Sequence, residues 1–345
     1  MERLVVIGAG MAAGRMLEHL TERNAPFDIT HFNAEPSGTY NRLMLSPVLA
    51  GEKTYEQIVT HDGAWYDAHG ITTRFGERVT GIDRTAKVVM GEAGPVAYDK
   101  LVIATGSNPF MIPLPGHDLD GVISYRDLED TTRMMSLPKG ARAVVIGGGL
   151  LGLEAAAGMA ARGIDVTVIH IMGHLMERQL DPEAAGLLQA SLEAKGITIL
   201  CNAHSDEILG GAGHVTGHKL KDGTVIACDL LCMAVGIRPS TQIAVDAGLY
   251  VEKGVIVDDK MQTSDPSIYA LGECVEHRGA LFGLVAPLYE QAKVLADVLT
   301  GQDAQFVQKS LSTKLKVTGC DLFSAGDFED GPGREDILYR DRGIY

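Results

Sequence analysis

Two stretches decide the fold: LVVIGAGMAAG (residues 4–14) and AVVIGGGLLGLEAA (residues 143–156). Each reads as an apolar strand, a glycine-rich turn and an alanine-rich helix in immediate succession. Glycines let such a turn bring its backbone close to a pyrophosphate, whose negative charge then lies at the N-terminus of the following helix. A single copy can also arise because a helix packs closely on a sheet. Two copies, a domain length apart, predict two dinucleotide-binding domains.

The two turns provide the first candidate binding residues. The small-residue positions are Gly8, Gly10 and Ala13 in the first copy and Gly147, Gly149 and Gly152 in the second. The two residues between the second and third of these positions in each copy are candidates as well: Met11 and Ala12, and Leu150 and Leu151.

The composition indicates a globular protein of enzyme size. The 345 residues allow two or three domains, and 46% hydrophobic residues argue against disorder. The net charge of −15 argues against nucleic acid or an anionic membrane as the main partner, because either would be repelled at long range. No stretch reaches the roughly 20 apolar residues of a membrane span. We therefore expect a cytoplasmic protein.

The five cysteines show neither a C-x-x-C pair nor the spacing of a zinc site, so we expect no metal site: Cys201, Cys228, Cys232, Cys274 and Cys320. The closest pair, Cys228 and Cys232, lies in IACDLLCMAVG (residues 226–236), which is typical of a buried strand. Four residues of strand separate Cα atoms by about 13 Å, beyond the roughly 7 Å limit for a disulfide. We expect reduced cysteines used as small core residues.

Glu35 and Arg42 are candidate ligands near the first turn. Glu35 follows a predicted strand, DITHF (residues 28–32), at the distance from the glycines where a carboxylate can bond ribose hydroxyls. A solvated loop acid is the alternative. Arg42 lies in a segment rich in small and polar residues, where a guanidinium could make paired hydrogen bonds to phosphate. A plain surface arginine is the alternative there.

Later landmarks follow the ends of two further apolar strands. Thr105 and Gly106 form a tight turn after residues 98–104, and Gly236 marks the return of the chain from the second glycine-rich region. Gly272 and Glu273 end an apolar strand, and a helix is predicted over residues 286–301. An acid in the place of Glu273 can hold a ribityl or ribose hydroxyl, whereas a helix cap or a solvated loop charge is the alternative.

Taken in order, GAGMAAG, ATGS, GGGLLGLEAA and TSDPSIYALGE resemble the two-dinucleotide-binding flavoproteins of the glutathione reductase superfamily, over about residues 1–310. Within that superfamily the chain is most similar to the N-terminal flavin part of the NADH-dependent assimilatory nitrite reductase large subunit. The stretches behind this likeness are YNRLMLSPVLAGE (residues 40–52), HIMGHLMERQLD (170–181), ALGECVEHRG (270–279) and STKLKVTGCDLFSAGD (312–327).

The resemblance implies an α/β fold with two Rossmann-like domains and a short remnant of a C-terminal third domain. We expect a discontinuous FAD-binding domain at residues 1–110 and 234–310, and an NAD(P)-binding domain at 111–233. Residues 311–345 would be a truncated C-terminal domain or tail, because a full third domain needs roughly a hundred residues.

For the first domain, the resemblance implies that Gly8, Gly10, Ala13 and Arg42 hold the FAD pyrophosphate and that Glu35 faces the adenosine ribose. Thr105 and Gly106 would lie along the FAD, and Glu273 would meet its ribityl chain. The predicted helix over residues 286–301 would direct its positive N-terminus at the flavin, stabilising the anionic reduced form.

For the second domain, the resemblance implies that Gly147, Gly149 and Gly152 take the nicotinamide dinucleotide. Glu154 would lie near the carboxamide and the flavin, as a tentative catalytic positioning residue. A helix acid favoured by the dipole is the alternative. His170 stands where an acid selecting NAD is common, so NADH over NADPH rests on the resemblance.

The activity implied is hydride transfer from NAD(P)H to FAD, then passage of single electrons to an iron–sulfur acceptor protein or subunit. No run of cysteines for a cluster or sirohaem follows Cys320, so we expect the chain to feed a nitrite reductase system within an oligomer or hetero-complex. The alternatives are a ferredoxin or rubredoxin reductase, the FAD subunit of another metalloenzyme complex, and a non-catalytic flavin-binding scaffold.

Overall fold

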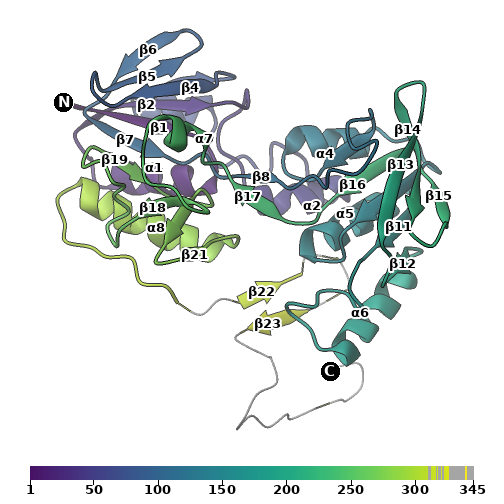
Figure 1. Cartoon of the computed structure of the whole chain (residues 1–345). Helices are drawn as coiled ribbons and strands as arrows, with labels where there is room; N and C mark the ends of the chain where they lie inside the picture. Colours follow the sequence, from purple (N-terminus) through teal and green to yellow (C-terminus); the bar gives the residue numbers. More distant parts are fainter. Residues whose placement is uncertain (310–311, 316, 318–319, 321, 326–338, 340–345) are drawn as a thin grey trace. The chain divides into compact units, whose positions relative to one another are not determined.

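The structure is a computed structural model that describes residues 1–309, 312–315, 317, 320, 322–325 and 339. The chain divides into two compact units (Figure 1). Unit 1 comprises Met1–Arg42, Tyr55–Asn108 and Ile237–Lys309, and unit 2 comprises Leu43–Thr54, Pro109–Gly236 and the described part of Ser310–Tyr345. Which dinucleotide each unit binds stays a prediction, as do the domain limits drawn from the resemblance.

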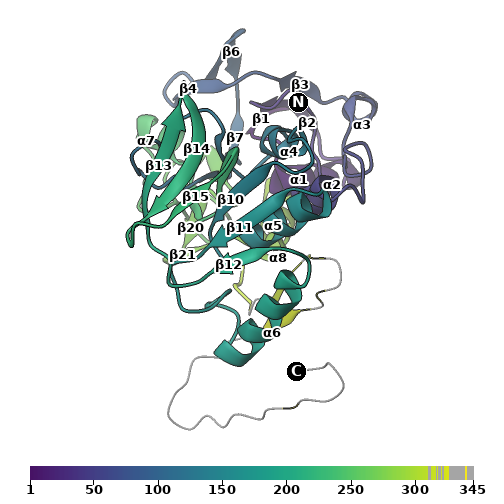
Figure 2. The same ribbon diagram turned by 90° about the vertical axis from the view of Figure 1, so that its right-hand side faces the viewer.

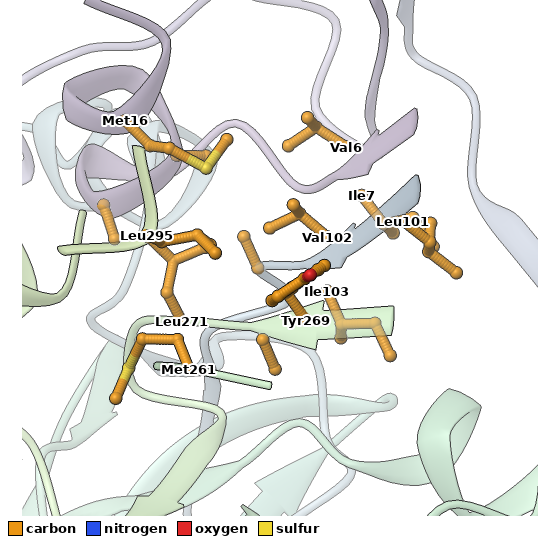
Figure 3. Close-up of a cluster of buried hydrophobic side chains, with 14 of the residues drawn as sticks. Val6, Ile7, Met16, Leu101, Val102, Ile103, Met261, Tyr269, Leu271 and Leu295 are labelled. Carbon is orange, nitrogen blue, oxygen red and sulfur yellow. The ribbon is translucent and has the colours of Figure 1, made fainter. Parts of the chain in front are cut away.

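Unit 1 is built on a five-stranded parallel sheet. Its strands, in spatial order, are β19 (Ile268–Ala270), β7 (Lys100–Ile103), β1 (Glu2–Ile7), β2 (Phe27–Asn33) and β3 (Thr72–Phe75). Helices α1 (Met11–Glu22) and α8 (Val285–Leu299) pack against each other and contribute to the same apolar core. Figure 3 shows Met16 of α1 and Leu295 of α8 near Val102 of β7. Because apolar residues fill this core, the central strands read as uninterrupted apolar runs.

Smaller elements complete unit 1. They are a three-stranded antiparallel sheet of β4 (Val79–Asp83), β5 (Val88–Gly91) and β6 (Gly94–Ala97), and a second small sheet of β18 (Val255–Val257), β20 (Val275–His277) and β21 (Ala280–Leu281). The short helices are α3 (Gly63–Ala68) and α7 (Gln242–Asp246), and β8 (Ser107–Pro109) pairs with β17 (Ile237–Pro239).

Unit 2 repeats the plan with its own parallel sheet. Its strands, in spatial order, are β12 (Thr198–Leu200), β11 (Asp165–Ile169), β10 (Arg142–Ile146), β16 (Leu230–Met233) and β9 (Val122–Ser124). Helix α5 (Leu150–Ala161) packs on β10 and β11, as Figure 2 shows. A second apolar core forms around Val144, Ile146 and Leu231.

The other elements of unit 2 surround this sheet. They are the 3₁₀ helix η1 (Arg42–Met44), which begins at the end of unit 1, with α2 (Leu45–Leu49), α4 (Leu128–Met135) and α6 (Pro182–Glu193). An antiparallel sheet contains β13 (Ser205–Gly211), β14 (His214–Leu220) and β15 (Val225–Ala227), and β22 (Ser312–Lys314) pairs with β23 (Phe323–Ala325). Most of residues 311–345, the predicted truncated C-terminal domain or tail, lies outside the described residues. Among the described residues, no helix combines the length and the apolar character needed to cross a bilayer.

The single buried strand predicted over residues 226–236 is wrong in one respect. Cys228 lies between two strands, because its amide bonds to Thr216 of β14 at 3.1 Å while the next amide, of Asp229, bonds to Arg142 of β10 at 2.8 Å. The chain thus passes from the antiparallel to the parallel sheet at this point. Cys228 and Cys232 are both fully buried, and burial raises the pKa of the Cys228 thiol to about 12. Both behave as core residues.

Candidate dinucleotide sites

The first glycine-rich turn lies at the centre of the sheet of unit 1. Gly8 follows β1 with a φ of +105°, and a Cβ added there would overlap the carbonyl oxygen of Ala104, just after β7. The amide of Ala104 bonds to Ile7 at 2.8 Å, which joins the ends of the two strands. The strand order changes direction between β1 and β7, and ligands of such sheets bind outside the strand ends at this point.

The second turn has the same geometry. Gly147 follows β10 with a φ of +126°, and a Cβ there would overlap the carbonyl oxygen of Ala234, after β16. A Cβ at Gly152 would overlap the carbonyl oxygen of Gly147, so this third glycine serves the packing of α5 on the turn. The fully buried Ala13 holds the corresponding place in unit 1. Gly236, also with positive φ, accepts the amide of Phe110 at 2.9 Å.

The helices after the two turns begin without a side-chain cap. Gly10 and Gly149 are the N-cap residues of α1 and α5, and neither helix has an acid in its first turn. A Cβ added at either glycine would meet nothing within 4 Å. The opening residues of the two helices, whose amides thus find no capping side chain, are Met11, Ala12, Leu150 and Leu151.

Three other helices begin differently, because aspartate side chains cap them. Asp62 caps α3, Asp127 caps α4 and Asp181 caps α6. The amides at the start of a helix attract an anion, and an open approach lets a phosphate reach them. The starts of α1 and α5 therefore fit the pyrophosphates of FAD and of a nicotinamide dinucleotide.

The structure brings Glu35 and Arg42 together. The Arg42 guanidinium pairs with the Glu35 carboxylate and donates to the Tyr40 hydroxyl at 2.7 Å. The Tyr40 hydroxyl donates in turn to Glu35 at 2.8 Å. The Arg42 guanidinium lies 4.7 Å from the centre of the Tyr40 ring. The side chains of Arg42 and Glu35 are only 22% and 27% exposed. Neither residue is therefore a freely solvated charge. Tyr40 was not predicted as a site residue, because it belongs to no motif with a recognisable spacing.

The later landmarks of unit 1 also come together. Ser107 donates to the Glu273 carboxylate at 2.7 Å, and Thr105 donates to the carbonyl of Ser240 at 2.6 Å. The carbonyl of Gly106 accepts the Ser240 amide at 2.9 Å. The strand-end acid is therefore joined to the ATGS turn, a pairing that the sequence analysis did not predict.

Gly272 lies against the start of α1. It has a φ of +94°, and a Cβ there would lie 3.4 Å from the Cβ of Ala12. Its amide donates at 2.8 Å to Gln291, a fully buried residue of α8 that the sequence analysis missed. The side-chain nitrogen of Gln291, Nε2, has no hydrogen-bond partner among the described residues. A buried donor without an acceptor destabilises a fold by about 1–3 kcal/mol. A bound ligand that offers an acceptor to Nε2 of Gln291 would therefore stabilise unit 1.

Glu154 lies on α5 and is held by a residue of α2. Ser46 donates to the Glu154 carboxylate at 2.6 Å, and the Tyr125 hydroxyl donates to Ser46 at 3.2 Å. Burial raises the pKa of Tyr125, which keeps its proton in place for this bond. Leu49 of α2 packs on Gly158 of α5, where a Cβ would approach it to 2.7 Å. Ser46 and Tyr125 could not be predicted from the sequence, because segments far from Glu154 along the chain bring them to it.

A pocket of about 290 Å³ opens beside this bond. Ser46 and Pro47 of α2, Glu154 and Ala157 of α5, and Lys195 are among its lining residues. Over the described residues, no group of three or more His, Cys, Asp or Glu is placed to hold a metal ion.

Comparison with known proteins gives consistent matches. Nitrite reductase [NAD(P)H] of Bacillus subtilis (strain 168) is 47% identical over 100% of this chain and 43% of its own length. The assimilatory nitrate reductase electron transfer subunit of the same organism is 44% identical over 100% of this chain and 45% of its own length. The chain thus spans less than half the length of these relatives.

Among solved structures, the reductase in the covalent putidaredoxin reductase–putidaredoxin complex superimposes with a TM-score of 0.87 and 27% identity, over 94% of this chain and 81% of that one. This match confirms the predicted α/β fold of the glutathione reductase type. The model of the family described as pyridine nucleotide-disulphide oxidoreductase matches residues 2–294. The chain therefore belongs to the pyridine nucleotide-disulphide oxidoreductases, a family of enzymes that use FAD and NAD(P)H.

Proposed function

We propose that this chain oxidises NADH through a bound FAD and passes single electrons to an iron–sulfur acceptor, as the cytoplasmic electron-input part of a nitrite reductase system. The observation that supports it most is the uncapped helix start after a glycine-rich turn in each unit. Two such anion sites in one chain match a bound flavin dinucleotide and an exchanging nicotinamide dinucleotide.

Unit 1 is the proposed FAD domain. The amides at the start of α1 would hold the pyrophosphate, with Arg42 as its cationic partner and Glu35 toward the adenosine ribose. Tyr40 would keep these two side chains in register, because it bonds to both. Glu273, fixed by Ser107, would meet the ribityl chain. Bound FAD supplies the conversion of a two-electron hydride into single electrons.

Unit 2 is the proposed nicotinamide domain. The amides at the start of α5 would hold the pyrophosphate of NADH, and Glu154 would orient the nicotinamide carboxamide. The hydrogen bonds from Tyr125 to Ser46 and from Ser46 to Glu154 fix the rotamer of that carboxylate. Such orientation matters because hydride transfer requires the donor and acceptor atoms to be aligned.

The acceptor is proposed from the relatives. One relative is named a nitrite reductase and another an electron transfer subunit of assimilatory nitrate reductase, and both match the whole of this chain. The structural match is a reductase in complex with putidaredoxin. We therefore propose an acceptor protein or subunit that contains an iron–sulfur cluster, reached within a hetero-complex.

Anaerobic stopped-flow measurement of the flavin absorbance tests this proposal. The FAD-loaded chain is mixed with NADH, with NADPH or with buffer, and the reduced protein is then mixed with a sirohaem- and cluster-containing nitrite reductase domain. We expect fast bleaching with NADH and reoxidation of the flavin by the nitrite reductase domain. A flavin that neither nucleotide bleaches would overturn the oxidoreductase proposal and favour the non-catalytic scaffold.

A ferredoxin or rubredoxin reductase is the second candidate. The structural match to putidaredoxin reductase favours it. The same reduced protein is mixed with a [2Fe–2S] ferredoxin and with a rubredoxin in parallel. Faster reoxidation by either carrier than by the nitrite reductase domain would replace the nitrite reductase assignment.

A further inference from the structure

The second glycine-rich turn contains a glycine that the dinucleotide motif itself does not require. In the motif G-x-G-x-x-G any residue can stand at the second position, and in this chain that residue is Gly148. A Cβ added at Gly148 would lie 2.7 Å from Cγ of His170 and 2.8 Å from Cδ2 of Leu175. A side chain at position 148 would therefore overlap both the ring of His170 and the end of the Leu175 side chain, which explains the glycine.

His170 directly follows β11, where dinucleotide-binding domains of this type commonly have an acid that binds ribose. Its side chain is only 7% exposed. The amide of Gly148 donates to its Nδ1 at 3.1 Å, and its Nε2 lies 3.1 Å from a carboxylate oxygen of Glu177. Because an amide can only donate, Nδ1 is the unprotonated nitrogen and Nε2 donates to Glu177. Both ring nitrogens are used, so His170 cannot itself bind a ribose.

The loop after β11 returns to the glycine-rich turn. The amide of Met176 bonds to the carbonyl of Gly148 at 3.0 Å, and Met176 adopts a left-handed φ of 51°. Leu175 and Met176 are fully buried and anchor the loop. Glu177 is therefore held beside the turn, with a side chain that is still 30% exposed.

We propose that Glu177, positioned by His170, binds the adenosine ribose hydroxyls of NADH and excludes the 2′-phosphate of NADPH. A carboxylate accepts hydrogen bonds from a ribose diol, whereas a 2′-phosphate would face it with like charge. Glu177 thus takes the role that an acid at position 170 would have. This inference rests on the proposed binding of a nicotinamide dinucleotide by unit 2.

Arg178 is the competing group in the same loop. An arginine near the adenosine ribose accommodates a 2′-phosphate. Arg178 is exposed and makes no hydrogen bond or ion pair with the part of the chain that the structure describes, whereas Glu177 is held by His170. Ordering Arg178 on a phosphate would cost side-chain entropy, while Glu177 is already in place.

Equilibrium titration of the FAD-loaded full chain with NAD⁺ and with NADP⁺ tests the proposal, because neither oxidised nucleotide reduces the flavin. The variant Glu177→Gln removes the charge. His170→Asn keeps an acceptor for the Gly148 amide and removes the donor to Glu177. Asp165→Asn is the matched control, because it removes one negative charge from the exposed, opposite end of β11.

We expect the wild-type chain to bind NAD⁺ at least tenfold more tightly than NADP⁺. Glu177→Gln should weaken NAD⁺ binding about tenfold, the loss of one hydrogen bond to a charged group, and leave NADP⁺ binding unchanged or tighter. The NAD⁺/NADP⁺ affinity ratio should fall partly in His170→Asn and stay constant in Asp165→Asn. FAD content and melting temperature verify that each variant is folded.

A wild-type preference for NADP⁺, or an affinity ratio in Glu177→Gln within twofold of the wild-type ratio, would overturn the proposal. The result is separable from the fate of the proposed function. A ratio that depends on Glu177 in a chain whose flavin NADH cannot bleach would refute only the electron-transfer role. Bleaching by NADH with an unchanged ratio would refute only the role of Glu177, and binding of neither nucleotide would refute both.

Discussion

The hydroxyl of Ser46 sits between two groups with fixed hydrogen-bonding roles. Tyr125 donates to it and the Glu154 carboxylate accepts from it. A carboxylate held in this way loses little freedom when a substrate arrives, so the orientation of the nicotinamide would depend on a residue that does not itself react.

Ser46→Ala should slow flavin reduction by NADH about tenfold, because one hydrogen bond to a charged group contributes about 1.5–3 kcal/mol. The observed rate at saturating NADH, measured by stopped flow, is the readout. Ser136→Ala is the control, because within the described part of the chain that hydroxyl bonds only to a carbonyl of the exposed end of α4. A rate for Ser46→Ala within twofold of the wild-type rate would show that Glu154 needs no support.

At the level of single residues, the charged site residues could be predicted from the sequence, but the residues that hydrogen-bond to them could not. Glu35 and Glu273 follow predicted strands, and Arg42 lies in a segment rich in small and polar residues. Tyr40 and Ser107, which fix them, carry no such mark, because a hydroxyl can bond in many geometries and only the folded chain selects one.

Two kinds of helix start occur among the elements of this chain. Asp62, Asp127 and Asp181 cap their helices, whereas α2, α7 and α8 begin without a side-chain cap. Helices α1 and α5 also lack such a cap, and they differ in that each follows a glycine-rich turn and has a glycine at the N-cap with open space around it, Gly10 or Gly149. An N-cap aspartate is favoured over glycine by only a few tenths of a kcal/mol. The open starts therefore cost little and leave room for a ligand anion.

Gly149→Asp should have opposite effects on stability and on binding. Its backbone φ of −86° and the open space around it accept an aspartate. We expect a melting temperature equal to or slightly above that of the wild type, with NAD⁺ affinity at least tenfold weaker, because the carboxylate competes with the pyrophosphate for the same amides. Calorimetric titration and a melting curve measure the two effects. Unchanged NAD⁺ affinity would place the pyrophosphate elsewhere.

Strand β2 contains a histidine that should make the fold sensitive to acid. His31 is fully buried, donates from Nε2 to the carbonyl of Gly8 at 3.0 Å, and burial lowers its pKa to about 4. The unfolded chain binds this proton near pH 6.5 and the folded chain does not. The stabilisation is therefore complete above pH 6.5 and is lost as the pH falls toward 4.

Urea unfolding of the apo chain at pH 7.5 and pH 5.0 measures this effect. We expect His31 to account for a loss of about 2 kcal/mol between these values, and His31→Gln, which keeps a donor for Gly8, to reduce the loss by about that amount. His218 has a similarly lowered pKa and stays in both proteins, so it cancels in the comparison. Equal losses in both proteins would contradict the assignment.

The segment from η1 to α2 shows where element prediction fails. The segment was described only as rich in small and polar residues, yet LSPVL forms a helix although it contains a proline. The proline lies in the first turn, where its missing amide hydrogen has no helical partner to lose. Packing of Leu49 on Gly158 supports this short helix. A local sequence pattern cannot predict this contact, because the two residues lie far apart along the chain.

For the whole molecule, the repeated glycine-rich turn predicted two dinucleotide-binding domains, and the family resemblance implied that both are Rossmann-like. The turn geometry does recur at Gly8 and Gly147. The allocation of the smaller segments was beyond the sequence. Leu43–Thr54 belongs to unit 2, although it follows the first glycine motif along the chain. Long-range packing decides this membership.

Two units with separate cores should respond separately to their ligands. We expect differential scanning calorimetry of the apo chain to resolve two transitions, one raised by FAD and the other by NAD⁺. At a ligand concentration one hundred times Kd the stabilisation is about 2.7 kcal/mol. ADP-ribose, which lacks the nicotinamide, serves as the control and should raise the NAD⁺-sensitive transition alone. Both dinucleotides raising the same transition would contradict the assignment of one ligand to each unit.

The contact between Gly148 and His170 has a further consequence for how this chain could change over time. A methyl group at position 148 would overlap the histidine ring and also Cδ2 of Leu175, so Gly148→Ala should be harmful while the histidine is present. Once a smaller residue replaces His170, the end of the Leu175 side chain can move into the freed space, and the alanine should be tolerated. Residues 148 and 170 can therefore be substituted in one order only. Divergence of this loop would have to begin at position 170, and the glycine could be lost only afterwards.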